Sequence, residues 1–271
     1  MSARSAGPLA KLPVFWEYQA PERWRSIDFI SDLHLQASHP RTFEAFASHL
    51  RHTDADAVFI LGDLFEAWVG DDARHSGFEA QAFEVLKEVA SLRALAFMPG
   101  NRDFLVGSAM LEECGAIGLS DPTVLVAFGA RVLLTHGDAL CIEDVTYQAF
   151  RAQVRDARWQ AAFLARPLAE RRAIAAQMRT QSQKHQAQQR PENWADVDTA
   201  SAVQWMQQAG TPVLVHGHTH RPARESLAPG FVREVLPDWD FDAPEPRGAV
   251  LRLSAAGLRR IEPSREGARA R

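Results

Sequence analysis

The sequence predicts an α/β fold in which short, buried strands alternate with helices. Apolar runs at residues 27–30, 57–61 and 94–98 have the length and composition of strands. Helical patterns at residues 41–51 and 78–92 separate these runs. A β-α-β-α-β order calls for a parallel sheet with helices packed on its faces. In such folds, polar groups that follow the strands gather at one edge of the sheet, where active sites lie.

Later segments extend this pattern with further strands and one long helical stretch. Strands are expected near residues 124–126, 132–134, 212–215, 231–236 and 249–253. The stretch between residues 144 and 209 has helical character and interrupts the strand series. We therefore expect a helical cap insert at about residues 145–209, placed over the catalytic sheet.

The length of the chain is consistent with one catalytic domain. Its 271 residues can bury the core of one large α/β domain that carries an insert. We assign this domain to residues 26–262. Residues 1–25 and residues 263–271 are expected to be flexible tails, because the first contains three prolines and no continuous apolar run and the second is rich in Arg, Gly and Ser.

Composition and charge exclude several classes of function. The formal charge of −4 and the pI near 6.2 provide no overall basic field, so nucleic acid is not an expected partner. No stretch approaches the ~18 apolar residues of a membrane span, so membrane contact is expected to be peripheral. Cys114 and Cys141 are too few for a disulfide framework and are expected to be buried free thiols. A reduced, cytoplasmic compartment fits this cysteine usage.

Seven polar residues follow the expected strands at positions suited to metal binding. Each lies at or shortly after the end of an apolar run, and the set is Asp32, His34, Asp63, Asn101, His136, His216 and His218. Buried carboxylates and imidazoles at one edge need a compensating positive charge, which two divalent cations would supply. Mixed oxygen and imidazole ligands suit Mn²⁺, Fe²⁺ or Zn²⁺. Asp63, at the centre of the series, is the candidate to bridge both cations.

Several neighbouring residues have more than one interpretation. His220 is either a ligand or a hydrogen-bond partner of a ligand, and it is left out of the expected ligand set. Arg102 either stabilises a phosphate through its forked guanidinium or pairs with Asp103 in a structural bridge. Asp71 and Asp72 are expected to act as turn or helix-cap residues.

The ordered motifs resemble those of the calcineurin-like metallophosphoesterases. D-x-H, G-D, G-N-R-D, H-G-D and G-H-T-H occur here in the order typical of that family. The resemblance implies a sandwich of mixed sheets flanked by helices, with a helical cap insert. Within the family, the sequence is most similar to members that act on UDP-2,3-diacylglucosamine in lipid A synthesis. That similarity covers roughly residues 26–260 and is carried by residues 60–68, 70–72, 100–105 and 216–222.

The resemblance also implies roles for individual residues. It assigns Asp32, His34, Asp63 and His218 to one Mn²⁺ ion, and Asp63, Asn101, His136 and His216 to a second. It implies catalytic roles for Asn101, Arg102 and His136, and substrate contacts for Asn101, Arg102, Asp144, Ser182 and His216. The reaction implied is attack of water on the UMP phosphorus, which releases UMP and 2,3-diacylglucosamine 1-phosphate. The family's Asn and Lys after Ser182 are replaced by Gln186 and by Gln189 or Arg190, so these are not counted as contacts.

The cap segment is basic and carries large apolar residues. Residues 151–190 contain nine Lys or Arg against two acidic residues. Interleaved with them are Trp159, Phe163, Leu164, Leu168, Ile174 and Met178. One interpretation is a solvated helix face over a packed core. The resemblance favours another, in which the cap receives acyl chains and rests peripherally on the anionic cytoplasmic face of the inner membrane.

Two other functions share the same motifs. A calcineurin-like phosphodiesterase or nucleotide pyrophosphatase with a soluble substrate would keep every metal ligand and differ in the cap. A non-catalytic metal-binding scaffold would keep the fold, but it would not need Asn101 and His136 to complete a second metal site.

Overall fold

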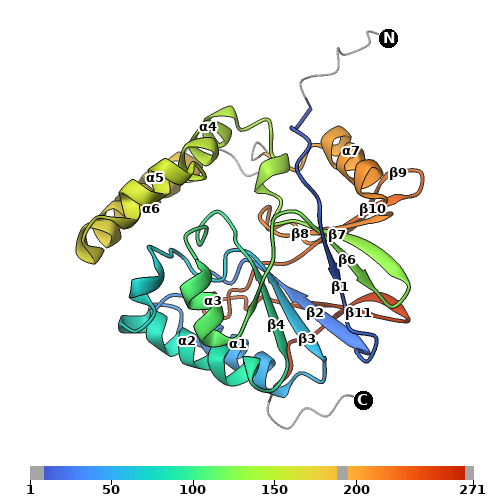
Figure 1. Cartoon of the computed structure of the whole chain (residues 1–271), viewed down its shortest axis with the longest axis horizontal. Coiled ribbons are helices and arrows are strands. Elements are labelled where there is room, and N and C mark those ends of the chain that lie inside the picture. The colour runs from blue at the N-terminus through green and yellow to red at the C-terminus, as the bar shows by residue number, and fades with distance from the viewer. Residues whose placement is uncertain (1–8, 188–194, 266–271) are drawn as a thin grey trace.

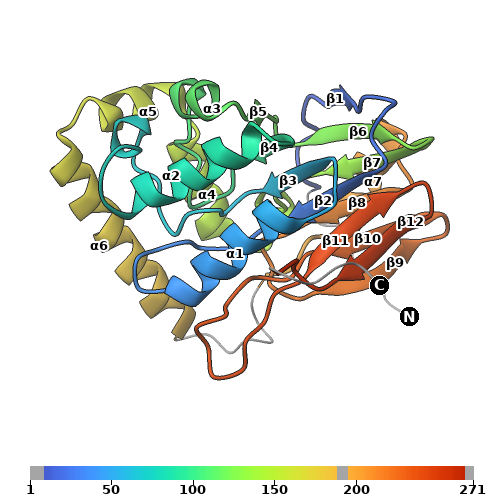
Figure 2. The same cartoon turned by 90° about the horizontal axis from the view of Figure 1, so that it is seen from below.

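Two six-stranded sheets lie face to face in the computed structural model, which describes residues 9–187 and 195–265 (Figures 1 and 2). The first sheet has the order β12-β11-β2-β3-β4-β5. Its parallel strands are β2 (Ser26–Ile30), β3 (Ala57–Leu61), β4 (Ala94–Met98) and β5 (Ile117–Gly118). An antiparallel pair, β11 (Val250–Ser254) and β12 (Gly257–Ile261), extends the sheet beside β2.

The second sheet has the order β1-β6-β7-β8-β10-β9 and also mixes strand directions. β8 runs parallel to both β7 and β10, whereas β6 and β7 form an antiparallel pair. The strands are β1 (Trp16–Gln19), β6 (Thr123–Ala127), β7 (Ala130–Leu134), β8 (Val213–His216), β9 (Ala223–Ala228) and β10 (Phe231–Val235).

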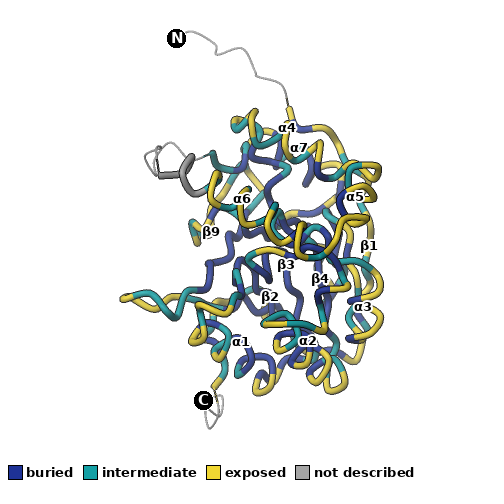
Figure 3. Tube along the Cα trace, turned by 90° about the vertical axis from the view of Figure 1, so that its left-hand side faces the viewer, coloured by how far each residue is buried: buried dark blue, intermediate teal, exposed yellow. Residues whose placement is uncertain are grey.

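Three apolar cores hold four layers together. Phe29 and Phe59 of the first sheet pack with Leu134 and Val215 of the second, so one core lies between the sheets. The outer face of the first sheet is covered by α1 (Pro40–His52), α2 (Gly77–Ala90) and α3 (Ser108–Cys114). The outer face of the second sheet is covered by α7 (Thr199–Ala209). Because both of its faces are covered, β3 is buried at all five positions (Figure 3).

This architecture confirms the predicted fold class. The bounds of β3 and β4 coincide with the predicted runs. β2 begins one residue earlier than predicted, and α1 and α2 differ from prediction by one or two residues at each end. Runs that are buried on both faces are almost entirely apolar, and their limits are therefore plain in the sequence. Cys114 and Cys141 are free and buried, as expected.

The N-terminal segment differs from the expected flexible tail. Trp16–Gln19 form β1, which pairs in parallel with β6, and the nearby Trp24 is buried. Most side chains of β1 are exposed, so this edge strand has no apolar alternation by which it could be recognised. Ser264, expected in the C-terminal tail, donates its backbone N–H to Nδ1 of His49 at 3.1 Å. Residues 1–8 and 266–271 lie outside the described part of the chain.

The expected cap insert divides into two parts. α4 (Val145–Val154), α5 (Ala157–Leu164) and α6 (Leu168–Ala187) stand along one side of the molecule (Figures 1 and 2). α7 instead belongs to the sheet layers, because Trp205 and Met206 pack with Leu133 and Leu214. Pro167 lies between α5 and α6. Because proline has no backbone N–H to donate to a helical hydrogen bond, it accounts for the break between the two helices.

Four arginines of the cap turn toward the sheets. Arg151 contacts Asp138 at 2.8 Å, and Arg155 donates to the carbonyl oxygen of Gly100 at 2.9 Å. Arg171, only 2% exposed, donates to Asp72 and to the carbonyl of Val69. Arg179 forms an ion pair with Glu66. Part of the basic charge noted in the sequence therefore anchors the cap and is not presented to solvent.

A buried charged network supports the strand that leads to the site. Asp28 of β2 is fully buried and accepts from Nε and Nη2 of Arg252 at 2.6 and 2.9 Å. Thr53 also donates to Asp28, at 2.5 Å, and His49 lies 3.4 Å from the same carboxylate. These contacts tie β2 to β11 and to the end of α1.

We predict that Arg252→Met lowers the free energy of unfolding by about 3 to 5 kcal/mol, because the Asp28 carboxylate loses its buried partner. Urea denaturation measures this difference. Arg259→Met, at the exposed position paired with Arg252 across the sheet, should change stability by less than about 0.5 kcal/mol. Equal effects of the two substitutions would contradict a specific role for the buried pair.

Candidate metal centre

The candidate ligands stand on backbone of unusual conformation. Six described non-glycine residues have a positive φ, and five of them lie at the strand ends of the site. These five are Asp32, His34, Asp63, His218 and His220, with φ of 54°, 47°, 53°, 66° and 52°. Left-handed backbone is costly for such residues, about 1 to 3 kcal/mol each, and it persists where the surrounding structure imposes it. The strain is therefore concentrated at one place, where these side chains converge.

Three glycines allow the ligand loops to approach one another closely. A Cβ atom on Gly62 would lie 2.5 Å from Nδ1 of His136, and Gly62 also has a φ of 87°. A Cβ on Gly100 would lie 2.2 Å from Oδ1 of Asp63, and one on Gly217 would lie 2.2 Å from Oδ2 of Asp32. Since side chains do not tolerate such distances, only glycine fits at these positions.

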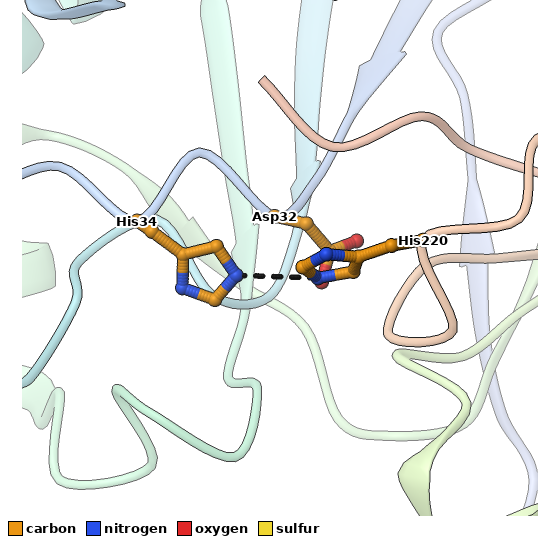
Figure 4. A group of neighbouring side chains, drawn as sticks. All are labelled: Asp32, His34 and His220. Atoms are coloured by element: carbon orange, nitrogen blue, oxygen red, sulfur yellow. Dashed lines mark hydrogen bonds and ion pairs between the residues drawn. The ribbon is translucent and has the colours of Figure 1, made fainter. Parts of the chain in front are cut away.

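One group of potential ligands consists of Asp32, His34 and His220 (Figure 4). Nε2 of His220 lies 3.4 Å from Oδ1 of Asp32 and 3.3 Å from Nε2 of His34. Nε2 of His34 in turn lies 3.9 Å from Oδ2 of Asp63. Oxygen and imidazole donors from three loops therefore face a common point, as they do around a divalent transition metal.

A second group surrounds the side-chain oxygen of Asn101. That oxygen lies 2.9 Å from Nε2 of His136 and 2.8 Å from Nδ1 of His218. Nε2 of His136 lies 3.7 Å from Oδ1 of Asp63. Asp63 thus directs one carboxylate oxygen toward each group, the arrangement of a ligand shared between two metals.

Several imidazoles have a partner on the side away from the site. Nδ1 of His136 lies 2.9 Å from the carbonyl oxygen of Leu61. Nδ1 of His34 lies 3.3 Å from Oε2 of Glu66, and Nδ1 of His220 lies 3.7 Å from Oδ2 of Asp238. The hydrogen bond to Leu61 favours a proton on Nδ1 of His136, and the nearby carboxylate charges favour the same tautomer of His34 and His220. Nε2 of each ring then keeps its lone pair for a metal.

His216 occupies a different environment from the other candidates. It is fully buried, its Nδ1 lies 2.9 Å from the carbonyl oxygen of Gly217, and its Nε2 has no hydrogen-bond partner among the described residues. Within the described chain it makes no hydrogen bond or ion pair with the other six expected ligands. The structure brings His220 to the cluster instead. The sequence signal for His220 was its place as the third histidine of H-G-H-T-H. The motif alone does not indicate which of its three histidines bind a metal.

The site has a negative electrostatic potential that favours a cation. Burial acts to lower the pKa of His136, but the charges of Asp63, Asp32 and Asp138 outweigh it and raise that pKa to about 9. Burial lowers the pKa of His34 to about 4, against the charge of Asp63. A neutral imidazole of this kind is the form that binds metals.

Asp103 organises the loops that carry the ligands. Its carboxylate accepts from the backbone N–H groups of Asp63, Leu64, Phe65 and Gly100, at 3.2, 2.7, 3.3 and 2.8 Å. It makes no ion pair with Arg102 within the described chain, so the structural-bridge interpretation of that arginine is not supported. The side chain of Arg102 instead lines the cavity described below.

Other acidic residues near the site have structural contacts. Asp138 accepts from the hydroxyl of Tyr147 at 2.6 Å, and the Tyr147 ring lies 5.8 Å from that of His218. Asp71 accepts from the backbone N–H groups of Gly107 and Met110, each at 2.9 Å, as expected of a cap residue. Asp72 differs in pairing with Arg171.

A cavity of 460 Å³ connects the cluster to the cap. Its lining includes Asn101, Arg102, Asp144, Ser182 and His218 but not His216. Asp144 also caps α4 by accepting from the N–H of Tyr147 at 2.9 Å. The side chains of Gln186, Gln189 and Arg190 lie outside the described residues. Glu66 and Arg179, which the sequence did not single out as site residues, also line this cavity.

Comparisons with known proteins identify relatives along most of the chain. A family model for calcineurin-like phosphoesterases matches residues 25–222. A protein of Xanthomonas campestris pv. campestris named UDP-2,3-diacylglucosamine hydrolase is 45% identical over 242 residues, covering 85% of this chain and 96% of that protein. A Cellvibrio japonicus protein of the same name is 44% identical over 237 residues, covering 85% and 95%. Among solved structures, Vacuolar Protein Sorting 29 from Cryptosporidium parvum has 14% identity and a TM-score of 0.47, over 90% of this chain and 94% of that one.

The family match extends across the ligand-bearing motifs from Asp32 to His220, and the donor set is that of a divalent metal site. The chain therefore belongs to the calcineurin-like phosphoesterase family and is a metal-dependent hydrolase.

Proposed function

We propose that this chain hydrolyses the pyrophosphate bond of UDP-2,3-diacylglucosamine to give UMP and 2,3-diacylglucosamine 1-phosphate. The names of the two relatives support this substrate. The observation that carries the proposal is the cavity, because it is polar at the metal cluster and apolar beneath the cap. A substrate with a charged pyrophosphate and two acyl chains needs both parts in one continuous space.

The apolar part of the cavity supports acyl-chain binding. It is lined by Trp68, Phe104, Phe150, Trp159, Phe163 and Met178. Each CH₂ group transferred from water to such a surface contributes about 0.8 kcal/mol. The large apolar residues noted in the cap sequence lie in different surroundings in the structure. Leu164 is 42% exposed, Leu168 and Ile174 pack against the core, and Met178 faces the cavity.

Two Mn²⁺ ions would be held by eight ligand positions that seven residues provide. We assign Asp32, His34, Asp63 and His220 to one ion and Asp63, Asn101, His136 and His218 to the other. This assignment replaces the expected His216 with His220 and moves His218 to the second ion. It is supported by the contacts around Asp32 and Asn101 and by the left-handed backbone at His218 and His220.

The cations, when bound, would lower the pKa of an attacking water and neutralise charge on the phosphoryl oxygens. The water oxygen forms a bond to the UMP phosphorus, and the bond from that phosphorus to the bridging oxygen breaks. The bridging oxygen leaves with the diacylglucosamine 1-phosphate. Arg102, which lines the cavity beside Asn101, would donate to the phosphate oxygens as their charge increases.

We infer peripheral contact with the cytoplasmic face of the inner membrane. None of the helices within the described ranges has the length and apolar character needed to cross a bilayer. Val145, Phe150 and Leu164 of the cap are 74%, 36% and 42% exposed, an arrangement that supports shallow insertion of the cap beside its substrate.

The proposed ligand assignment predicts different metal content for two histidine variants. His220→Ala should reduce bound Mn²⁺ from two ions per chain toward one and lower kcat by at least ~10²-fold. His216→Ala should retain two ions, since among the described residues this ring makes no hydrogen bond or ion pair with the other ligands. Metal analysis after gel filtration measures both. The reverse pattern would restore the assignment expected from the sequence.

The proposed substrate predicts Mn²⁺-dependent release of UMP from UDP-2,3-diacylglucosamine by the purified protein. A matched control is UDP-glucosamine without acyl chains, which should have a kcat/KM lower by at least ~10²-fold. Liquid chromatography of the nucleotide products measures both. If the two substrates are equally good, a soluble nucleotide is the substrate. If neither this substrate nor bis(p-nitrophenyl) phosphate is cleaved, the chain is a metal-binding scaffold.

The cap's role predicts a separation of KM from kcat. Met178→Asp places a charge in the apolar cavity and should raise KM for the diacyl substrate by ~10-fold or more. Turnover of bis(p-nitrophenyl) phosphate should stay near normal. The control is Gln177→Asp, at the adjacent, exposed position outside the cavity. Parallel loss with both substrates would show that Met178 supports the fold and not acyl binding.

The proposed role of Arg102 predicts a defect in the chemical step. Arg102→Ala should lower kcat by ~10²-fold or more while both metal ions remain bound. Steady-state kinetics and metal analysis measure the two quantities. A loss of metal in proportion to the loss of activity would mean that Arg102 acts through the fold of the Asn101 loop.

A further inference from the structure

Glu66 connects a side chain of the cap with a side chain of the metal centre. Its side chain is 12% exposed, and its backbone N–H donates to the carbonyl oxygen of Leu35 at 3.2 Å. Oε2 lies 3.3 Å from Nδ1 of His34, while Oε1 forms an ion pair with Nε of Arg179 on α6. One carboxylate therefore contacts both a proposed ligand and the cap.

The charge of Arg179 is partly buried and therefore needs the carboxylate of Glu66 more than the charge of an exposed arginine needs its partner. Its side chain is 28% exposed, and burial acts to lower its pKa, with the charge of Asp63 opposing. A guanidinium stays protonated even when buried, so its charge needs a nearby anion. Glu66 is its one ion-pair partner within the described residues.

The other arginines that anchor the cap do not contact a proposed ligand side chain. Arg171 is bound to Asp72 and Val69, Arg151 to Asp138, and Arg155 to the backbone of Gly100. Among the described arginine contacts of α6, the Glu66–Arg179 pair alone continues to an imidazole of the metal cluster, whereas α4 has its own contact through the ring of Tyr147 beside His218. The Glu66–Arg179 pair is therefore the contact through which the position of α6 and the metal centre can affect each other.

We propose that Glu66 is a positioning residue that couples the seating of α6 on the cavity to metal occupancy at Asp32, His34 and His220. The inference rests on the proposed function, because it takes these three residues as ligands of one ion. The carboxylate charge, 3.3 Å from Nδ1 of His34, favours a proton on that nitrogen and leaves Nε2 directed at the metal. Arg179 holds the carboxylate in that position only when α6 lies against the sheets.

The coupling acts in both directions. A metal ion that fixes the ring of His34 also fixes Glu66, and so favours the position of α6 in which Arg179 reaches it. By linkage, a seated α6 increases the affinity of that metal site by the same factor. Met178, Gln181 and Ser182 of α6 line the cavity, so a substrate that holds α6 in place would also strengthen the adjacent metal site.

The test combines calorimetric titration of the apo-protein with Mn²⁺ and amide hydrogen exchange of residues 168–182 with and without Mn²⁺. We expect two ions to bind to the wild-type protein and to slow exchange in α6. Glu66→Gln should weaken one of the two sites by ~10- to 100-fold, leave the other near normal, and abolish the response of α6 to Mn²⁺.

Arg179→Gln tests the coupling without touching a ligand. It should weaken the same site by a smaller factor and also abolish the exchange response. The control is Arg172→Gln on the same helix, since Arg172 contacts Glu79 and Ser76 away from the ligands. This control should retain the full Mn²⁺ response, whatever its basal exchange rate.

Four results would overturn the inference. If two ions bind to the wild-type protein with no change in α6, the metal centre stands and the coupling does not exist. If both variants keep the exchange response, or if Glu66→Gln weakens both sites equally, Glu66 is a structural residue. A folded wild-type protein that binds no Mn²⁺ would overturn the metal centre itself, and the coupling with it.

Discussion

The buried negative charge at the carboxyl ends of the strands is the constraint on which the rest of this structure depends. Asp32 and Asp63 are 0% and 2% exposed, and charged groups in such surroundings are costly unless they are compensated. Four imidazoles from the loops after β2, β7 and β8 converge on them, and a divalent cation is the compensation that this donor set fits. The strained backbone of both aspartates shows that packing of the loops, and not local preference, holds this arrangement.

Contacts around the ligands prevent their strained backbone from relaxing to an ordinary conformation. Asp103 accepts four backbone N–H groups and fixes the loops after β3 and β4 relative to each other. Gly62, Gly100 and Gly217 leave no room for even one methyl group where the ligand loops approach one another. Beneath them, the Asp28 and Arg252 network joins β2 to β11. Ligand geometry is therefore a property of both sheets together.

The cap depends on the same edge of the sheets. Arg151, Arg155, Arg171 and Arg179 direct their charges inward, to carboxylates and carbonyl groups that lie close to the ligand loops. The cavity beneath the cap is consequently bounded on one side by the proposed catalytic groups and on the other by apolar side chains of the helices. Counting charges along residues 151–190 overstated the basic surface, because a count does not distinguish a solvated arginine from one that anchors a helix.

The sequence by itself determined the α/β class, the parallel strands and most residues of the site. Doubly buried strands are almost wholly apolar, and the polar residues that follow them stand out by contrast. Two features became evident only from the tertiary structure. The edge strand β1 has mostly exposed side chains, which leave no pattern in the sequence, and α7 packs on the second sheet and not in the cap. The proposed assignment of His220 in place of His216 also depends on tertiary structure. His216 remains in the ladder of β8, where pairing with Val235 sets its direction, whereas the backbone at His218 and His220 turns left-handed and brings their rings to the cluster. No spacing in H-G-H-T-H encodes that turn, since it arises from contacts with loops nearly two hundred residues earlier in the chain, among them the bonds from the N–H of His218 to Asp32.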